Sequence, residues 1–347
     1  MKLKIGLIAA AAASTTLSIA VPVTTANAAT TLRYAEFSPN RGWRAAVHKW
    51  MVKELEKRSK GQIKVRVSWG GSLIKARAVL RGVGSGLADM GTIVGVYTPK
   101  QLENFRVGDI PTGNDDPWVG LRAMYDVATK NPTVKAEFDK QNVVYLGNFT
   151  SSTILLSCKR PITKLSDLKG LKVRANPPHS EVFKKFGAII VSMPFPEIYQ
   201  ALDKGIIECA QTYWVAIYAY KHTEVAKHIT ALKWSQNMGF GMIMNRNKFN
   251  RMSPAHQKLM RDLGRDMTEV VAKVTIGSTA KLKQLITKDK SVQVHSLDTA
   301  SQKELATATA EAGKLFKGDP SVLKDYLTAV DKYEAERKAK GYPWARK

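Results

Sequence analysis

The amino-acid sequence predicts an α/β protein built from two lobes. Strand-like segments alternate with helix-like segments along most of the 347 residues, and this alternation is typical of α/β folds. A chain of this length can form two domains, each with its own core. One helical pattern begins after Ser253 and continues to about Thr287. Such a helix would be about 50 Å long, which exceeds the radius of one domain, so we expect it to brace both lobes.

In the first half of the chain, the spacing of apolar residues defines the elements in order. Residues 63–67 alternate apolar and basic side chains, as in a strand with one covered face. Apolar residues within 44–58 recur at helical spacing, and Gly61 ends that helix. The polar residues 150–152 indicate a crossing between the lobes. We expect strands at 32–37, 63–67, 90–96, 143–149 and 153–158, and helices at 44–58, 76–85 and from about Trp118.

The second half of the chain repeats the alternation. Gly187 and Gly205 end two helices, and Pro196 starts one. Ser253 followed by Pro254 provides an N-cap and a first-turn residue for the long helix. We expect strands at 171–175, 188–192, 206–212, 229–234 and 240–245, and helices at 181–186, 196–205, 214–226 and 254–287.

The first 28 residues have the pattern of a secretory signal peptide. Lys2 and Lys4 precede an apolar, Ala-rich run from 5 to 23, and the Ala-Asn-Ala tripeptide at 26–28 suits signal peptidase. Cleavage would leave a chain that begins near Ala29. The alternative, an uncleaved anchor helix, fits less well with the Ser and Thr content of the run and with its small-residue exit. We therefore expect an exported protein.

The chain is strongly basic, with 54 Lys and Arg against 29 Asp and Glu and a formal net charge of +25. Such an excess attracts anions, which include organic acids, lipid headgroups and nucleic acid. Export and the absence of zinc-finger or RNA-binding motifs argue against a nucleic-acid partner. The charge is also spread along the chain, as on a solvated surface.

The cysteine content is low, and the sequence does not decide the state of the two thiols. Cys158 and Cys209 would be exported to a compartment where paired thiols can oxidise. Neither lies in a metal-like CxxC spacing. One structural disulfide and two buried thiols are both compatible with the sequence.

Enzyme motifs are scarce. The chain has no GxxxxGK(S/T), no GxSxG, no HExxH and no GxGxxG between a strand and a helix. The glycine-rich segment 82–86 lies at a helix end and is interpreted as a turn. Asp115 and Asp116 precede a helix, so we expect them to cap it rather than to catalyse. No nucleophile, base and oxyanion hole assemble in the pattern, so the motifs do not indicate an enzyme.

The most informative motifs lie between residues 159 and 214. They are KRPI at 159–162, LSDLKGLKVR at 165–174 and PEIYQALDKG at 196–205. Their order resembles the solute-binding proteins of tripartite ATP-independent periplasmic (TRAP) transporters, the DctP-like family. In that family a KPI…DLKGLKxR segment is followed by a PxxExYxALxxG helix. Gly61, Arg77 and Gly86-x-x-Asp89-Met90 agree more loosely with the family pattern, and the resemblance runs from about Leu32 to the long helix.

The resemblance implies a two-lobed periplasmic binding protein fold, type II-like, with a long helix bracing both lobes. It assigns 29–149 and about 237–265 to the first lobe, and 150–236 and about 266–347, with the C-terminal helices, to the second. It also implies a periplasmic location, an organic acid as ligand and membrane permease subunits as partners. We expect a monomer, and we assign no cofactor, no metal-binding residue and no nucleic-acid partner.

The resemblance also identifies the expected binding site. Arg174 matches the substrate-clamping arginine of the family, and a planar guanidinium can hold a carboxylate by two parallel hydrogen bonds. We expect Gln211 and Thr212 to assist it, and Trp214 or Tyr97 to stack on an apolar or aromatic part of the ligand. The full set of expected substrate-binding residues is Phe37, Trp69, Arg77, Tyr97, Arg174, Gln211, Thr212, Tyr213, Trp214 and Asn237.

Two positions depart from the family pattern. Ile154 stands where many members carry a second arginine, and Thr212 stands at the usual asparagine. Because a second cationic clamp is missing, a monocarboxylate fits better than a dicarboxylate, unless Arg41 or Arg77 replaces that clamp. The alternative functions are binding of a four-carbon dicarboxylate, a sensor or adhesion module with a basic surface, and an exported enzyme on the same architecture.

Overall fold

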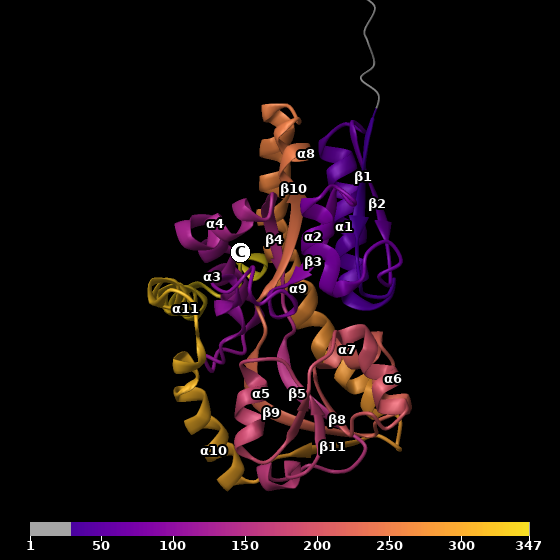
Figure 1. Cartoon of the computed structure of the whole chain (residues 1–347), viewed down its shortest axis with the longest axis vertical. Coiled ribbons are helices and arrows are strands. Elements are labelled where there is room, and N and C mark those ends of the chain that lie inside the picture. Colours follow the sequence, from indigo (N-terminus) through magenta and orange to yellow (C-terminus); the bar gives the residue numbers. More distant parts are fainter. Residues whose placement is uncertain (1–28, 347) are drawn as a thin grey trace, which may run out of the picture.

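The computed structural model describes residues 29–346. It contains two β-sheets with their helices, and these form the two lobes that the sequence predicts (Figure 1). We call the five-stranded sheet with its helices the first lobe and the six-stranded sheet with its helices the second lobe. The expected signal peptide, residues 1–28, lies outside the described residues.

The first lobe is built on a sheet with the strand order β2-β1-β3-β10-β4. β1 pairs in parallel with β2 and β3, whereas β10 is antiparallel to β3 and β4. Its strands are β1 (Thr30–Ala35), β2 (Ile63–Ser68), β3 (Met90–Val94), β4 (Val143–Phe149) and β10 (Phe240–Asn245). Its helices are α1 (Gly42–Arg58), α2 (Val79–Gly84), α3 (Pro117–Lys130), α4 (Pro132–Lys140) and α8 (Arg246–Asn250).

The second lobe is built on a sheet with the strand order β11-β9-β5-β8-β6-β7. β6 pairs in parallel with β7 and β8, and β5 is antiparallel to β8 and β9. Its strands are β5 (Thr153–Cys158), β6 (Lys172–Arg174), β7 (Ile189–Val191), β8 (Cys209–Thr212), β9 (His228–Gln236) and β11 (Gln293–Ser296). Its helices are α5 (His179–Lys185), α6 (Ile198–Asp203), α7 (Trp214–Ala219) and α10 (Thr299–Ala310).

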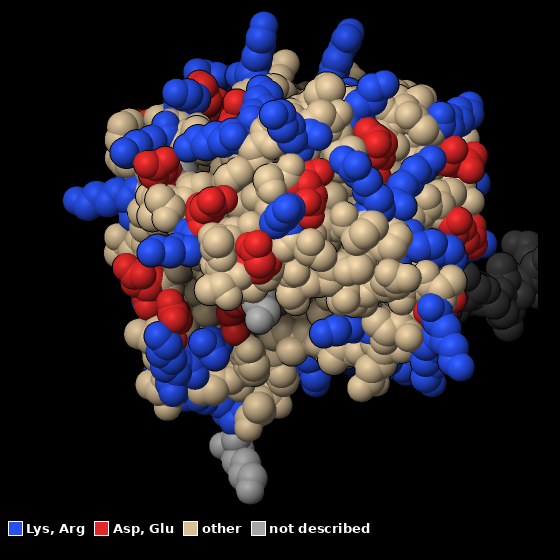
Figure 2. Space-filling view, turned by 90° about the horizontal axis from the view of Figure 1, so that it is seen from below, with Lys and Arg blue, Asp and Glu red and all other residues tan. Residues whose placement is uncertain are grey.

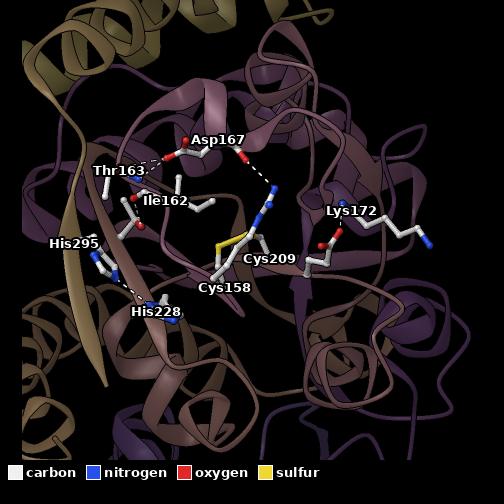
Figure 3. Close-up of a disulfide and its surroundings, with 11 residues drawn as sticks. Cys158, Ile162, Thr163, Asp167, Lys172, Cys209, His228 and His295 are labelled. Carbon is white, nitrogen blue, oxygen red and sulfur yellow. Dashed lines mark hydrogen bonds between the residues drawn. A yellow bond between two sulfur atoms is a disulfide. The ribbon is translucent and has the colours of Figure 1, made fainter. Parts of the chain in front are cut away.

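A disulfide between Cys158 and Cys209 joins β5 to β8 (Figure 3). The two residues are opposite each other in the strand register, and both are buried in the core of the second lobe. Of the two states that the sequence leaves open, the structure contains the disulfide.

The chain crosses between the lobes at two adjacent segments. Residues 150–152 lead from β4 to β5, as the sequence predicts, and residues 237–239 return from β9 to β10. The Ser151 N–H donates to the Asn237 carbonyl at 3.1 Å, and the Asn237 N–H donates to Ser151 Oγ at 2.7 Å. These hydrogen bonds tie the two crossings together where the lobes meet.

The long helix α9 (Pro254–Thr287) contacts both lobes. It packs against β4, α1 and α3 of the first lobe and against α7 of the second (Figure 1). Ser253 caps it, since Ser253 Oγ accepts a hydrogen bond from the His256 N–H at 3.2 Å. The predicted brace is confirmed.

The C-terminal helices divide between the lobes. α10 packs on β9 of the second lobe, but α11 (Pro320–Lys340) packs on α3 of the first lobe. Val322, Tyr326 and Tyr333 of α11 are buried within the cluster that holds the core of the first lobe. The structure therefore corrects the expectation that all of 266–347 belongs with the second lobe, because the apolar face of α11 is covered by the first.

Several local elements differ from the sequence prediction. α7 ends at Ala219 rather than near 226, because Lys221 has a φ of 57°, which is incompatible with a right-handed helix. β8 begins at Cys209 rather than 206, since the Ile207 N–H instead donates to the Ala201 carbonyl. The sequence analysis did not predict α4, whose N-cap is Asn131.

Basic side chains are distributed over the surface. Figure 2 shows Lys and Arg interspersed with Asp and Glu on the face seen from below. The positive charge on this face is therefore spread rather than gathered in one patch. Among the described residues, no helix has the length and apolarity that crossing a membrane requires.

Candidate functional site

A pocket lies between the lobes, where the carboxyl ends of β3, β6 and β8 meet the crossing segment before β10. Ligand sites commonly form outside the carboxyl ends of parallel strands. The pocket contains about 360 Å³ of space, including the part that is open to solvent. Six of the expected residues line it, namely Tyr97, Arg174, Gln211, Thr212, Tyr213 and Asn237. Seven others also line it, namely Val94, Val96, Asp109, Ile154, Asn176, Phe195 and Phe240.

Arg174 is the last residue of β6, and its side chain is buried in the wall of the pocket. Its Nε and Nη2 donate to the Met193 carbonyl at 3.0 and 2.8 Å, and its Nη1 donates to the Gln211 carbonyl at 3.4 Å. These bonds fix the plane of the guanidinium and use three of its five N–H groups. Burial lowers the pKa of Arg174, although arginine remains charged. The remaining N–H groups can donate to a carboxylate.

Gln211 and Thr212 are the last residues of β8 and lie beside Arg174. Gln211 Oε1 accepts a hydrogen bond from the Asn176 N–H at 3.2 Å, and Gln211 Nε2 has no partner among the described residues. Thr212 Oγ1 lies 3.5 Å from Nδ1 of His222. Burial, with a smaller effect of Arg174, lowers the pKa of His222 to about 3, so its imidazole is neutral. Because Gln211 Oε1 already accepts a hydrogen bond, the Gln211 amide is oriented with Nε2 available to donate to an anion.

Aromatic side chains from both lobes form the walls. The Phe195 N–H donates to the Tyr97 hydroxyl at 2.8 Å, which connects the lobes across the pocket. The ring centroids of Phe195 and Tyr213 are 5.4 Å apart, and Cζ of Arg174 lies 5.3 Å from the Phe195 centroid. The pocket therefore combines an apolar, aromatic wall with a few fixed polar groups, as small-molecule sites usually do.

A second cavity adjoins this pocket and shares Phe195, Tyr213 and Phe240 with it. Arg44, on α1, lines the second cavity and is only 6% exposed. Its Cζ lies 4.9 Å from the Phe240 ring centroid and 5.2 Å from that of Phe149. Arg44 Nη1 has no hydrogen-bond partner among the described residues. The cavity therefore places a cation among aromatic rings.

Arg44 is a buried cation beside the expected site that the sequence analysis did not identify, and it lies in the adjoining cavity rather than in the pocket of Arg174. Arg41 instead donates from Nε to the Ala219 carbonyl at 3.1 Å and holds α1 to α7. Arg77 is exposed, with its Cζ 5.8 Å from the Tyr97 ring centroid. Arg44 shares the buried face of α1 with Val47 and Met51. A charged residue within an apolar helical stripe was the signal that could have identified it.

Asp109 is the second residue that the sequence analysis missed. It ends a short 3-10 helix and is 2% exposed. Its Oδ1 accepts a hydrogen bond from the Gly239 N–H at 3.1 Å, whereas its Oδ2 has no partner among the described residues. Burial raises the pKa of Asp109 to about 6, although the Gly239 N–H and Arg106 partly oppose this rise. No periodic pattern surrounds Asp109, so the sequence offered no signal for it.

Four expected residues lie outside this pocket, namely Arg77, described above, and Trp214, Trp69 and Phe37. Trp214 is buried against Ile217 and Ile229 in a cluster of the second lobe, because the start of α7 directs it into the core. It is therefore not placed to stack on a ligand. Trp69 packs against the His48 ring, with centroids 5.4 Å apart. Phe37 lines the second cavity rather than the first.

The site has the groups needed to bind an anion. In the part of the chain that the structure describes, no three His, Cys, Asp or Glu side chains are grouped as metal ligands. The pocket offers charged and neutral N–H donors from Arg174 and Gln211, one carboxylate from Asp109, and aromatic walls. This combination can hold a solute by directional hydrogen bonds and stacking.

Two lobes joined by paired crossings, with a polar pocket between them, define a solute-binding protein that encloses its ligand. The chain belongs to the DctP family, described as bacterial extracellular solute-binding protein, family 7, whose model matches residues 35–318. It is thus a DctP-like solute-binding protein of the TRAP type and a receptor rather than an enzyme, as the sequence predicts.

Known proteins and structures agree with this assignment. A solute-binding protein of Albidiferax ferrireducens is 26% identical over 223 residues, which span 62% of this chain and 64% of that protein. A crystal structure of a TRAP periplasmic solute-binding protein from Desulfovibrio salexigens is 27% identical, has a TM-score of 0.74, and covers 89% of this chain and 98% of its own. A marine metagenome TRAP protein specific for aromatic acid ligands, solved with 3-hydroxybenzoate, has a TM-score of 0.80 at 22% identity, covering 88% and 99% of the two chains.

Proposed function

We propose that this protein binds an organic acid in the periplasm and delivers it to the membrane permease subunits of a TRAP-type transporter. The ligand is a monocarboxylate with an apolar or aromatic part. The observation that carries this proposal is the buried guanidinium of Arg174, which carbonyl oxygens hold in one plane with N–H groups left for a carboxylate. Bidentate pairing with a carboxylate is the interaction for which arginine is best suited.

Neighbouring groups support a single carboxylate. Gln211 Nε2 supplies a neutral donor beside Arg174, and the rings of Tyr213 and Phe195 suit an apolar or aromatic remainder. Asp109 lies in the same pocket, and its buried carboxylate would repel a second acid group directed at it. The likeness in fold to the structure with 3-hydroxybenzoate is compatible with an aromatic acid.

Thermal-shift measurements on the purified exported chain with a panel of organic acids test the proposal. A ligand that binds only the folded state raises the stability of the protein by RT ln(1 + [L]/Kd). The acids that bind most tightly should therefore give the largest increase in melting temperature. Arg174→Gln should weaken binding by at least about 30-fold, because a buried carboxylate loses its charged partner. Lys172→Gln is the matched control, since Lys172 lies two residues earlier on β6 with its side chain exposed.

The proposal fails if no organic acid raises the melting temperature, or if Arg174→Gln binds as tightly as the parent protein. The melting temperature of Arg174→Gln without ligand is measured alongside, because Arg174 also bonds the Met193 and Gln211 carbonyls. A folded variant that has lost binding supports the assignment, whereas retained binding removes Arg174 from the site.

Arg44 favours one second candidate, a ligand with two acid groups. Such a ligand would place one carboxylate at Arg174 and extend past Phe195 and Tyr213 to Arg44 in the adjoining cavity. Isophthalate and 3-methylbenzoate separate the two candidates, since they share a ring and differ in the second acid. Tighter binding of isophthalate, lost in Arg44→Met, would favour the two-acid ligand; tighter binding of 3-methylbenzoate would favour the monocarboxylate.

A further inference from the structure

The pocket contains buried polar atoms that the protein itself does not pair. Asp109 Oδ2, Gln211 Nε2 and Asn237 Oδ1 are buried, and none has a hydrogen-bond partner among the described residues. A buried polar group without a partner destabilises the protein, and the effect is larger if the group is charged. All three residues line the pocket that contains Arg174. These unpaired atoms are therefore available to form hydrogen bonds with a ligand.

These atoms fall into two chemical kinds. Gln211 Nε2 is a donor, because Gln211 Oε1 already accepts from the Asn176 N–H. It adds to the donors of Arg174 and suits a carboxylate. Asp109 Oδ2 is an acceptor when the carboxylate is ionised, whichever way the group is turned. The amide of Asn237 makes no side-chain hydrogen bond with a described residue, so it can accept or donate.

Asp109 is held firmly in place. The Gly239 N–H donates to its Oδ1 at 3.1 Å, and a Cβ at Gly239 would lie 2.3 Å from Oδ2. Gly239 follows Asn237 in the second crossing, so the carboxylate packs directly on the segment that connects the lobes. Arg106 acts electrostatically on Asp109, and Asp109 acts on Tyr326, but neither Arg106 nor Tyr326 hydrogen-bonds to Oδ2. The unpaired oxygen is thus a fixed feature of the pocket.

We propose that Asp109 determines specificity, by accepting a hydrogen bond from an N–H or O–H group that the ligand carries in addition to its carboxylate. This inference rests on the proposed function. Arg174 attracts the carboxylate of the ligand and Asp109 repels it, so the two residues orient the ligand along the pocket. The ligand class is a monocarboxylate with a hydroxyl, an amide or a lactam N–H, and unsubstituted acids of the same shape bind more weakly.

Matched pairs of acids test this inference by calorimetry on the purified exported chain. 3-Hydroxybenzoate is compared with 3-methylbenzoate, which replaces the hydroxyl by a group of similar size. Pyroglutamate is compared with 5-oxotetrahydrofuran-2-carboxylate, in which ring oxygen replaces the N–H. A hydrogen bond to a charged acceptor contributes about 1.5–3 kcal/mol, so the donor-bearing member of at least one pair should bind about tenfold or more tightly.

Asp109→Asn provides the second measurement. It should reduce that preference to about threefold or less while the hydroxyl-free and N–H-free acids keep their affinity. Asp115→Asn is the matched control, because Asp115 is an exposed acid of the following loop. Removal of an unpaired buried charge should leave the melting temperature without ligand unchanged or raised, whereas a purely structural role for Asp109 would lower it.

The outcomes separate this inference from the proposed function. If acids bind through Arg174 but neither pair shows the preference, or if Asp109→Asn keeps it, the inference is overturned and the proposed function stands. If no acid of any kind binds, the proposed function fails with it.

Discussion

The hydroxyl of Tyr97 in the first lobe accepts a hydrogen bond from the backbone N–H of Phe195 in the second lobe, at 2.8 Å. Both residues line the binding pocket, and both are buried. The contact is therefore a connection between the lobes that forms at the site itself. We expect ligand binding to be coupled to this contact, since a ligand that favours the arrangement containing the bond also favours the bond.

Tyr97→Phe should weaken ligand binding by about five- to thirtyfold. The variant keeps the ring but leaves the buried Phe195 N–H without its acceptor in the closed arrangement, which costs about 1–2 kcal/mol. Calorimetry gives the affinity, and small-angle scattering reports whether the ligand-bound form is more open. Tyr218→Phe is the control, because Tyr218 is 38% exposed and lies outside the pocket. Unchanged affinity in Tyr97→Phe would contradict a role for this bond in closure.

Glu36→Gln should lose less stability than the parent protein as the pH falls. Burial alone would raise the pKa of Glu36, but His48, Arg44 and the Thr92 hydroxyl together lower it to about 2. His48 Nε2 lies 3.0 Å from Glu36 Oε2. A carboxyl whose pKa is lowered on folding stabilises the fold above its unfolded pKa of about 4.5, and this contribution is lost as pH falls toward 2.

Melting temperatures between pH 6 and pH 2 measure this effect. The parent protein should lose about 3 kcal/mol across the window through Glu36, and Glu36→Gln should lack that part of the decline. Glu56→Gln is a control, since Glu56 lies on the exposed side of α1. If the melting temperatures of Glu36→Gln and the parent fell equally with decreasing pH, the Glu36 carboxylate would not be stabilising.

His179→Leu should reduce the pH dependence of the free energy of unfolding. Its effect should occur at a higher pH than the effect of Glu36→Gln. Burial lowers the pKa of His179 to about 3, and its ring packs edge-on against Trp234, with centroids 4.7 Å apart. Below the ordinary pKa of 6.5 the unfolded chain binds a proton that folded His179 does not. Stability therefore falls as pH decreases from 6.5 toward 3, by up to about 1.4 kcal/mol per pH unit for this residue.

Denaturant unfolding at several pH values from 7.5 to 4 measures that slope. The His179→Leu variant should show a smaller slope than the parent, whatever its stability at pH 7.5. His256→Leu, at a half-buried histidine near the start of α9, is the control variant. If the slope in His179→Leu equalled that of the parent, His179 would bind as many protons in the folded chain as in the unfolded chain, contrary to the prediction.

Replacement of both Cys158 and Cys209 by Ala should destabilise the protein by about 2–4 kcal/mol. The disulfide closes a loop with a sequence separation of 51 residues, so it restricts the unfolded chain. Denaturant unfolding with and without a reductant measures this difference. The reductant should shift the parent toward the double variant and leave the variant unchanged. Equal stability of all four samples would show that the disulfide does not stabilise the fold.

Much of the architecture could be predicted because it depends on local patterns. The strands β4 and β5 have the predicted bounds, since their apolar runs and the polar break between them identify both ends. Asp116 caps α3 through the N–H groups of Trp118 and Val119, as the sequence predicts. Lys221 shows the limit of such patterns, because its left-handed conformation ends a helical run that composition alone would continue.

The binding site was harder to predict, because exposure and partners depend on segments that are distant in the sequence. Tyr97 and Arg174 meet in one pocket although they belong to different lobes, and the family motif identified only Arg174 as a clamp. Trp214, two residues after Thr212, points into the core instead. Whether an aromatic residue faces a ligand or a core depends on which neighbours cover it.

The sequence by itself determined the alternation of strands and helices, the long helix that braces the lobes, and the family through its motifs. Only the tertiary structure decided that Asp109 and Arg44 are buried beside the expected site, that Cys158 pairs with Cys209, and that α11 covers the first lobe. The physical reason is that periodicity and capping act within a few residues, whereas burial, charge environment and pairing arise from contacts between segments that only the folded chain brings together.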